Sequence, residues 1–332
     1  MTDLINNNSN NDSKTHGDGI DRRGFLNCMA WAGTGLLWTM GAGALSACKL
    51  EGTGVGKGSF SFVQLSDSHI GFNKEPNTNV TTTFQEAITR INALPEKPAF
   101  LIHTGDLTHL SKPGEFDTVA EVLKSAKTNQ VFYVPGEHDV FVDQGKQYLE
   151  RYGKGTKGNG WQSFDYQGVH FIGLNNVVSS GAGANPGSVV AGGSEGLGLL
   201  GQEQLDWLKK DLSGRSNSTP IVVFAHVPLW TVYPQWGWGT QDGEQALSYL
   251  KGFGSVTVLN GHIHQIMQKV EGNVTFHTAR STAFPQPTPG SAPSPGPIKD
   301  VPAEKLRSML GLTNVNYVEK DSSLAVVDST LV

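Results

Sequence analysis

Ionisable side chains that can bind metals or transfer protons occur in five short groups along this chain. In chain order, the groups are Asp67-Ser68-His69, Gly105-Asp106, Gly136-Glu137-His138-Asp139, His226 and Gly261-His262-Ile263-His264. Each group directly follows an apolar run that is typical of a buried strand. Loops at the ends of such strands carry much of the chemistry of α/β proteins, so we expect the groups to meet. The third group, taken alone, is also typical of a polar surface turn.

The groups offer only carboxylate and imidazole, which are ligands for divalent ions such as zinc, manganese or iron. The pairs Asp67/His69 and His262/His264 each have a spacing of two. In an extended backbone, residues at this spacing point to the same side, so each pair can face one metal centre. The groups hold too many ligands for one tetrahedral ion, which indicates two ions.

A scaffold of strands and helices must position these groups, and the hydrophobic pattern predicts one. Strands are expected at residues 60–65, 99–102, 131–134, 161–164, 169–174, 220–225, 256–259, 274–277 and 324–327. Helices are expected at 81–94, 115–126 and 202–212, where apolar residues recur at helical spacing. The alternation of strand and helix predicts a largely parallel sheet covered by helices. Residues 179–201 form a long glycine-rich loop, and residues 285–302 a proline-rich surface excursion.

The composition limits the class of protein. A chain of 332 residues with 37% hydrophobic content can bury one large α/β core or two smaller ones. The net charge of −5, without a basic stripe, argues against a specific nucleic-acid partner. The two cysteines, Cys28 and Cys48, both lie near the N-terminus and cannot form a disulfide framework.

Taken in order, the five groups resemble the motifs of the calcineurin-like metallophosphoesterase superfamily. The resemblance extends over roughly residues 60–280. Residues 64–69 and 105–108 look most like those of class III cyclic-nucleotide phosphodiesterases. The resemblance implies a four-layer α/β/β/α sandwich over residues 60–332, with the site at the carboxyl ends of the strands.

The resemblance also implies a role for each residue. Asp67, His69 and His264 would hold one metal, Asp106 would bridge both, and Glu137, His226 and His262 would hold the other. His138 would be the acid that helps to expel the leaving oxygen, with Asp139 orienting its imidazole. The cofactors would be two divalent or trivalent ions of iron, manganese or zinc. The reaction would be hydrolysis of a small phosphodiester or phosphomonoester, by attack of a metal hydroxide on phosphorus.

Glu137 departs from the family pattern, which has asparagine at this position. A carboxylate adds a negative charge and one methylene of reach. We expect it to favour a harder or more highly charged ion, or to bind in a bidentate mode. The alternative is a lipoprotein on the same fold that binds metal or phosphate without catalysis.

Further histidines and aromatic residues lie near the motifs. His109 is expected to contact the substrate phosphate, and its alternative is an exposed loop histidine. His103, His170 and His277 look like ordinary strand histidines. Aromatic residues after His226 could stack on an apolar part of the substrate or could cover the sheet edge. These residues are Trp230, Tyr233, Trp236 and Trp238.

The N-terminal region has the pattern of an export signal. Arg22-Arg23 followed by Phe25-Leu26 and an apolar segment resembles a twin-arginine (Tat) signal, which implies the Tat translocase as a partner. The usual leading Ser/Thr and trailing Lys are absent, since Asp21 and Asn27 stand there.

The end of this region resembles a lipobox, Leu45-Ser46-Ala47-Cys48. It implies cleavage after residues 1–47, lipidation of Cys48 and a flexible tether over residues 48–59. The mature protein would then be a membrane-anchored lipoprotein in the periplasm or on the cell surface. The alternative is an uncleaved membrane anchor, although the apolar stretch is marginally short for a span. The sequence leaves the oligomeric state open.

Overall fold

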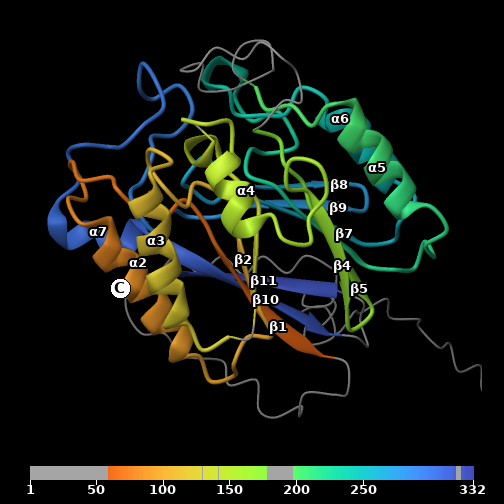
Figure 1. The fold of residues 1–332 in the computed structure, drawn as a ribbon, viewed down its shortest axis with the longest axis horizontal. Coiled ribbons are helices and arrows are strands. Elements are labelled where there is room, and N and C mark those ends of the chain that lie inside the picture. Colours follow the sequence, from red (N-terminus) through yellow and green to blue (C-terminus); the bar gives the residue numbers. More distant parts are fainter. Residues whose placement is uncertain (1–58, 129, 141, 178–196, 319–322) are drawn as a thin grey trace, which may run out of the picture. The chain divides into compact units, whose positions relative to one another are not determined.

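The computed structural model describes residues 59–128, 130–140, 142–177, 197–318 and 323–332 (Figure 1). The predicted signal over residues 1–47 and Cys48 lie outside the described residues. The same is true of nearly all of the predicted tether and most of the glycine-rich loop at 179–201. The described residues all belong to one compact unit.

The first sheet has five strands in the order β11-β10-β1-β2-β3. The strands are β1 (Phe60–Leu65), β2 (Leu101–His103), β3 (Val131–Tyr133), β10 (Gly311–Val318) and β11 (Ser323–Thr330). The first three are parallel, as the alternation of strand and helix predicts, and α2 (Val80–Asn92) and α3 (Pro113–Lys124) connect them. β10 and β11 form an antiparallel hairpin beside β1. In this hairpin, only the central part of β11 was predicted from the sequence.

The second sheet has six strands in the order β4-β5-β6-β7-β9-β8. The strands are β4 (Gln162–Tyr166), β5 (Val169–Gly173), β6 (Ile221–Phe224), β7 (Val256–Asn260), β8 (Gln268–Glu271) and β9 (Val274–Thr278). The four central strands are parallel, and β4 and β8 run antiparallel at the two edges. The two helices of this half are α5 (Gln202–Leu212) and α6 (Gly243–Leu250).

Short helices complete the described elements. They are α4 (Lys146–Tyr152), α7 (Ala303–Met309) and the 3-10 helices η1 (Glu137–Asp139) and η3 (Pro234–Trp236). With α6, they escaped prediction because one or two turns are too short for a helical period to be recognised. No helix in the described ranges has both the length and the apolar character that crossing a membrane requires.

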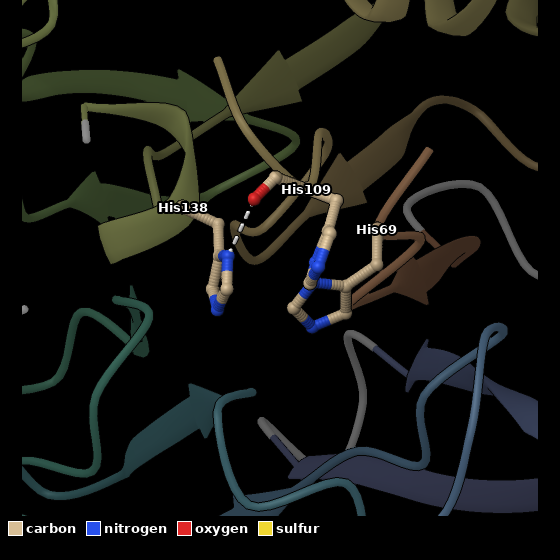
Figure 2. A group of neighbouring side chains, drawn as sticks. All are labelled: His69, His109 and His138. Atoms are coloured by element: carbon tan, nitrogen blue, oxygen red, sulfur yellow. Dashed lines mark hydrogen bonds between the residues drawn. The ribbon is translucent and has the colours of Figure 1, made fainter. Parts of the chain in front are cut away.

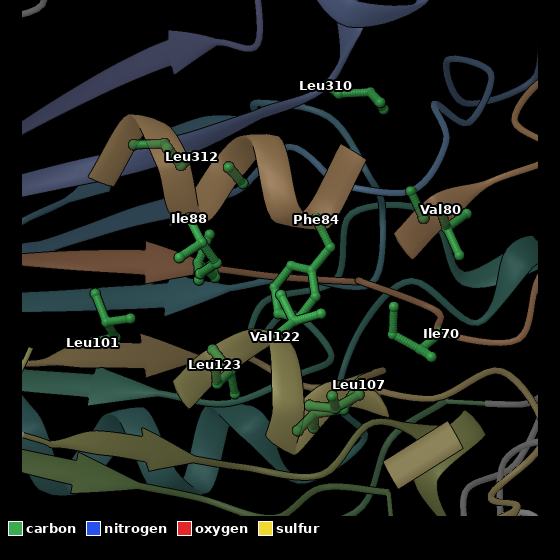
Figure 3. Packing of buried hydrophobic residues seen from close by; sticks show 14 of the residues in the cluster. Ile70, Val80, Phe84, Ile88, Leu101, Leu107, Val122, Leu123, Leu310 and Leu312 are labelled. Carbon is green, nitrogen blue, oxygen red and sulfur yellow. The ribbon is translucent and has the colours of Figure 1, made fainter. Parts of the chain in front are cut away.

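Three apolar clusters define the layers. One lies between the two sheets and includes Phe62 and Phe100 from the first sheet and Phe171 and Phe224 from the second. Another packs α2 and α3 on the first sheet, through residues such as Phe84, which is fully buried (Figure 3). The third packs α5 and α6, which lie side by side in Figure 1, on the second sheet. The predicted four-layer α/β/β/α sandwich is therefore confirmed.

The local sequence explains the two helices of the first half. The Asn79 side chain accepts a hydrogen bond from the Thr82 amide and so caps the first turn of α2. Pro113 begins α3, where a missing amide proton costs nothing. The Glu115 carboxylate accepts a hydrogen bond from the Leu110 amide, which fixes the loop before this helix.

The register of the strands determines where the site forms. Leu65, His103 and Tyr133 are neighbours at the ends of β1, β2 and β3. Phe224 and Leu259 are paired in the same way near the ends of β6 and β7. Because parallel strands end at one edge, the five loops that carry the ionisable groups begin side by side.

Candidate metal centre

Five of the seven predicted metal ligands have a left-handed backbone, which non-glycine residues rarely adopt. They are Asp67 (φ 53°), His69 (φ 41°), Asp106 (φ 52°), His262 (φ 69°) and His264 (φ 54°). Each such residue costs on the order of 1–2 kcal/mol. Backbone hydrogen bonds hold the conformation, among them those from the Asp67 amide to the Gly105 carbonyl (3.0 Å) and from the His69 amide to the Asp106 carbonyl (2.9 Å). Such strain is characteristic of functional loops.

The first cluster contains Asp67, His69 and His264, which are all buried and have ligand atoms within 4.8 Å of one another. His264 Nε2 lies 3.1 Å from His69 Nε2 and 3.3 Å from Asp67 Oδ1. The structure therefore brings together the three residues expected to hold one metal.

The second cluster contains Glu137, His226 and His262, again buried and within 4.8 Å of one another. Glu137 Oε2 lies 2.9 Å from His226 Nε2, and Glu137 Oε1 lies 2.9 Å from His262 Nδ1. The two oxygens thus face different histidines of the same cluster. Burial raises the pKa of Glu137, but the imidazoles of His262 and His226 lower it well below its usual value, so the carboxylate is ionised.

The donor atoms of this cluster test whether a metal would fit. Glu137 Oε2, His226 Nε2 and His262 Nδ1 are buried, and their close polar contacts among the described residues are with other carboxylates and imidazoles of the candidate centre. A buried polar atom without a partner costs about 1–3 kcal/mol, so these atoms need one another or a cation. Three such atoms that face one another and are all typical metal donors fit a bound cation.

Asp106 lies between the two clusters. Its Oδ2 is 3.4 Å from His69 Nε2 in the first cluster and 3.4 Å from His226 Nε2 in the second. This is the position that a bridging carboxylate would need.

The expectation that each closely spaced pair faces one metal through an extended backbone is wrong. Asp67 and His69 do share a cluster, but His262 and His264 belong to different clusters. The reason is the left-handed backbone of these residues, which removes the alternation of a strand.

Backbone carbonyls orient two of the ligating imidazoles. His226 Nδ1 donates to the Thr104 carbonyl (2.6 Å), and His264 Nδ1 donates to the Phe284 carbonyl (2.6 Å). These bonds fix the tautomer and leave each Nε2 free for a metal. The first cluster is tied to the second by the His262 amide, which donates to Asp67 Oδ1 (3.1 Å).

His138 lies near His69 of the first cluster (Figure 2) and near Glu137 of the second. Its amide donates to Asp106 Oδ1 (2.9 Å) and its Nδ1 donates to the His109 carbonyl (2.7 Å). Burial lowers the pKa of His138, but the carboxylates of Asp106 and Glu137 and the bond to the His109 carbonyl raise it above its ordinary value. The arrangement keeps a proton on Nδ1 and leaves Nε2 available at the centre.

The expectation that Asp139 orients this imidazole is wrong. Its carboxylate accepts hydrogen bonds from the amides of Gly136 (2.9 Å), Leu107 (3.1 Å) and Thr108 (2.8 Å). The adjacent residues of the 3-10 turn η1 direct their side chains apart, so Asp139 holds the loop after Asp106 instead. The residue that orients His138 is His109, through its backbone carbonyl.

The His109 side chain is half-buried and lies against the same centre. Its ring stacks on that of His138, with centroids 4.9 Å apart and planes at 17°. Its Nδ1 is buried without a hydrogen-bond partner among the described residues. Burial, together with the charge of His138, lowers the pKa of His109 to about 4, so the ring is neutral at pH 7.

The glycines of the motifs are required by close packing at the centre. A Cβ on Gly136 would collide with Asp106 Oδ1, and a Cβ on Gly261 would collide with the Ser66 hydroxyl and lie 2.7 Å from Asp67 Oδ2. Both glycines let a ligand-bearing loop approach a neighbouring ligand.

The aromatic residues after His226 divide into two kinds. Trp238 is fully buried, and Trp230 packs on Phe276 of the second sheet. Tyr233 and Trp236 are partly exposed and contact each other edge to face.

Two buried clusters of nitrogen and oxygen ligands that share a carboxylate, on an α/β/β/α sandwich, define the class of the protein. It is a metallophosphoesterase, a hydrolase of phosphoric esters. The model of the calcineurin-like phosphoesterase family matches residues 60–266, and the chain belongs to this family.

Known proteins similar to the chain fall in the same class. A probable cyclic nucleotide phosphodiesterase of Rhodococcus erythropolis is 24% identical over 68% of this chain and 71% of its own length. A probable glycerophosphodiester phosphodiesterase of Arcobacter nitrofigilis is 25% identical over 66% of this chain and 77% of its own. Among solved structures, a dimetal phosphatase from Danio rerio matches with a TM-score of 0.57 at 13% identity, over 82% of this chain and 96% of its own. This structural likeness bears on the fold alone.

Proposed function

We propose that the protein hydrolyses phosphodiester or phosphomonoester bonds with two transition-metal ions, of iron, manganese or zinc. The observation that carries this proposal is the pair of buried ligand clusters on either side of Asp106, with a ring nitrogen of His138 near by. Asp67, His69 and His264 would hold one ion, Glu137, His226 and His262 the other, and Asp106 would bridge them.

A phosphate ester is anionic and repels hydroxide, so hydrolysis needs both positive charge and a nucleophile. When bound, two such metals supply a Lewis acid for the phosphoryl oxygens and a water acidic enough to react near neutral pH. The chain supplies four histidine and three carboxylate ligands, and the burial of these residues keeps bulk water away.

His138 would donate a proton from Nε2 to the leaving oxygen, because its Nδ1 is already engaged with the His109 carbonyl. An alkoxide leaves poorly, so this proton matters most for esters of aliphatic alcohols. His109 would contact a phosphoryl oxygen, because its half-buried ring lies against that of His138. Its low pKa makes this contact a neutral one.

We favour a diester as substrate, because two of the similar proteins are probable phosphodiesterases. The partly exposed rings of Tyr233 and Trp236 are the aromatic residues after His226 that remain available to stack on an organic group.

Metal analysis combined with hydrolysis of bis(4-nitrophenyl) phosphate and 4-nitrophenyl phosphate tests the proposal. His138→Ala should lower turnover of dimethyl phosphate about a hundredfold or more, since acid catalysis contributes roughly 10²–10⁴-fold. It should lower turnover of the two 4-nitrophenyl esters much less, because 4-nitrophenolate leaves without a proton. The metal content of this variant should equal that of wild type and of the control Lys124→Ala, which changes an exposed side chain on α3. Two bound metals without turnover in wild type would instead identify the non-catalytic binding protein.

We further propose that the protein is exported by the Tat route and anchored by a lipid on Cys48, on the sequence of residues 1–47. Cys48→Ala should then move the exported protein from the membrane fraction to the soluble fraction. A variant that stays in the membrane would favour the uncleaved anchor.

A further inference from the structure

Ser111 has a backbone conformation that glycine would adopt more easily. Its φ is +52°, in the left-handed region, and the residue is buried. A non-glycine residue in this region is a sign that the side chain is needed. The Ser111 hydroxyl donates a short hydrogen bond, 2.6 Å, to the backbone carbonyl of His138.

This bond completes a set of contacts that hold His138 from one loop. The His138 amide is bound by Asp106 Oδ1 (2.9 Å), its ring by the His109 carbonyl (2.7 Å), and its carbonyl by Ser111. All three partners lie within residues 106–111. His138 itself sits in η1, a single 3-10 turn, whose own hydrogen bonds hold a residue weakly.

We propose that Ser111 is a positioning residue for His138, which its hydroxyl keeps in place to protonate the leaving oxygen. The inference rests on the proposed function, in which His138 is the acid. A general acid must lie within hydrogen-bond reach of the atom that it protonates. A displacement of about 1 Å can cost on the order of a hundredfold in rate. Without the hydroxyl, the His138 carbonyl keeps the longer contact with the Thr108 hydroxyl (3.5 Å), so the peptide that follows His138 is held less firmly and the ring can move.

Two substitutions separate the hydroxyl from the backbone conformation. Ser111→Gly removes the hydroxyl and relieves the backbone, whereas Ser111→Ala removes the hydroxyl and keeps the strain. Gln167→Gly is the matched control: Gln167 also has a left-handed φ (+44°), but it is exposed in the turn between β4 and β5. That turn precedes β5, whereas the site lies at the carboxyl ends of the strands.

The readout is the dependence of kcat on the leaving group, measured on the holoenzyme. Methyl 4-nitrophenyl phosphate and bis(4-nitrophenyl) phosphate release 4-nitrophenolate, whereas dimethyl and diethyl phosphate release an alkoxide. We expect Ser111→Gly and Ser111→Ala to lower kcat by about 10–100-fold for the alkoxide leaving groups and by less than about threefold for 4-nitrophenolate. Metal content should stay at the wild-type level, and the melting temperature of Ser111→Gly should equal or exceed that of wild type. Gln167→Gly should keep the wild-type ratio of the two rates.

The outcomes distinguish this inference from the function on which it rests. If His138→Ala shows the leaving-group dependence and the Ser111 variants do not, the positioning role of Ser111 is wrong, but the acid role of His138 still holds. Equal losses on both substrate classes, or loss of metal, in the Ser111 variants would also overturn the inference, because Ser111 would then support the fold or the metal centre. If His138→Ala shows no leaving-group dependence, the acid role fails, and the positioning role fails with it.

Discussion

Glu137 is the residue at which this metal centre differs from the pattern that its motifs resemble. An asparagine there would offer one neutral oxygen, whereas the carboxylate offers two, and each lies 2.9 Å from a different histidine of the cluster. The extra negative charge faces buried imidazoles, so it stabilises a cation at this position more strongly than an amide would. Metal preference is therefore expected to depend on this side chain.

Glu137→Asn tests that expectation. Changes beside a metal ligand typically cost 10–100-fold in affinity, so the loss of a charged ligand should weaken the second site for manganese by at least about tenfold. The first site should keep its affinity, and competition with a chelator resolves the two. Glu121→Gln on α3 removes an exposed charge and serves as control. Equal manganese affinities in Glu137→Asn and wild type would show that the charge of this side chain does not determine the affinity of the site.

At the level of elements, strands and helices with a strong apolar pattern were predictable. The bounds of β1 and α5 agree with the sequence, and α2 and α3 differ from it by one or two residues at each end. β10 was missed because asparagine is depleted in strands, although Asn314 and Asn316 alternate with Val315 and Tyr317, and because its partner β1 lies at the other end of the described chain. Pairing over long range, rather than local pattern, makes it a strand.

The candidate site likewise contains features that the sequence could predict and features that it could not. The candidate ligands could be predicted because five of the ten histidines follow apolar runs, as the carboxylates of the site do, and their spacing is informative. The carbonyls of Thr104, His109 and Phe284 that orient the rings could not, because every residue has a carbonyl and only the fold selects one. The role of Asp139 was implied by the family resemblance, and a motif does not show which acceptor the imidazole of His138 binds in this chain. The Ser111 hydroxyl was missed because a serine in a loop has no distinctive pattern.

Helix α5 is tied to the second sheet by an ionic network that makes stability depend on pH. Buried His170 contacts Asp165 through Nδ1 (2.8 Å) and Asp211 of α5 through Nε2 (2.7 Å). Burial raises the pKa of Asp211, but hydrogen bonds from His170 and Ser163 and the charges of His170 and Arg215 lower it below its usual value. A carboxyl with a depressed pKa stabilises the fold above its unfolded pKa of about 3.9, and the stabilisation is lost as the pH falls through the folded value.

Asp211→Asn should therefore lower the free energy of unfolding by about 1–3 kcal/mol at pH 7, since it weakens a charge-assisted bond to a buried ring. The difference from wild type should shrink as the pH falls below about 4. Urea unfolding at pH 7 and at pH 3 measures both quantities. Asp206 is exposed on the same helix, so Asp206→Asn should change the free energy of unfolding by less than about 0.5 kcal/mol. A constant difference at the two pH values would contradict the role given to Asp211.

At the scale of the whole described unit, the site exists only because two sheets meet. Asp67 and Asp106 follow strands of the first sheet, and His226, His262 and His264 follow strands of the second. The aromatic layer between the sheets and the bond between His277 of β9 and Asp328 of β11 (2.9 Å) hold them together. Each of the two ligand clusters contains residues that follow strands of both sheets. Metal binding should therefore depend on an intact sandwich.

Titration of the metal-free protein with manganese, followed by the rate of bis(4-nitrophenyl) phosphate hydrolysis, tests the central claim most directly. The two clusters and the shared Asp106 predict that turnover is negligible with the first equivalent and reaches its maximum at two equivalents per chain. Full turnover at one equivalent, or two bound equivalents without turnover, would contradict a dinuclear hydrolytic centre.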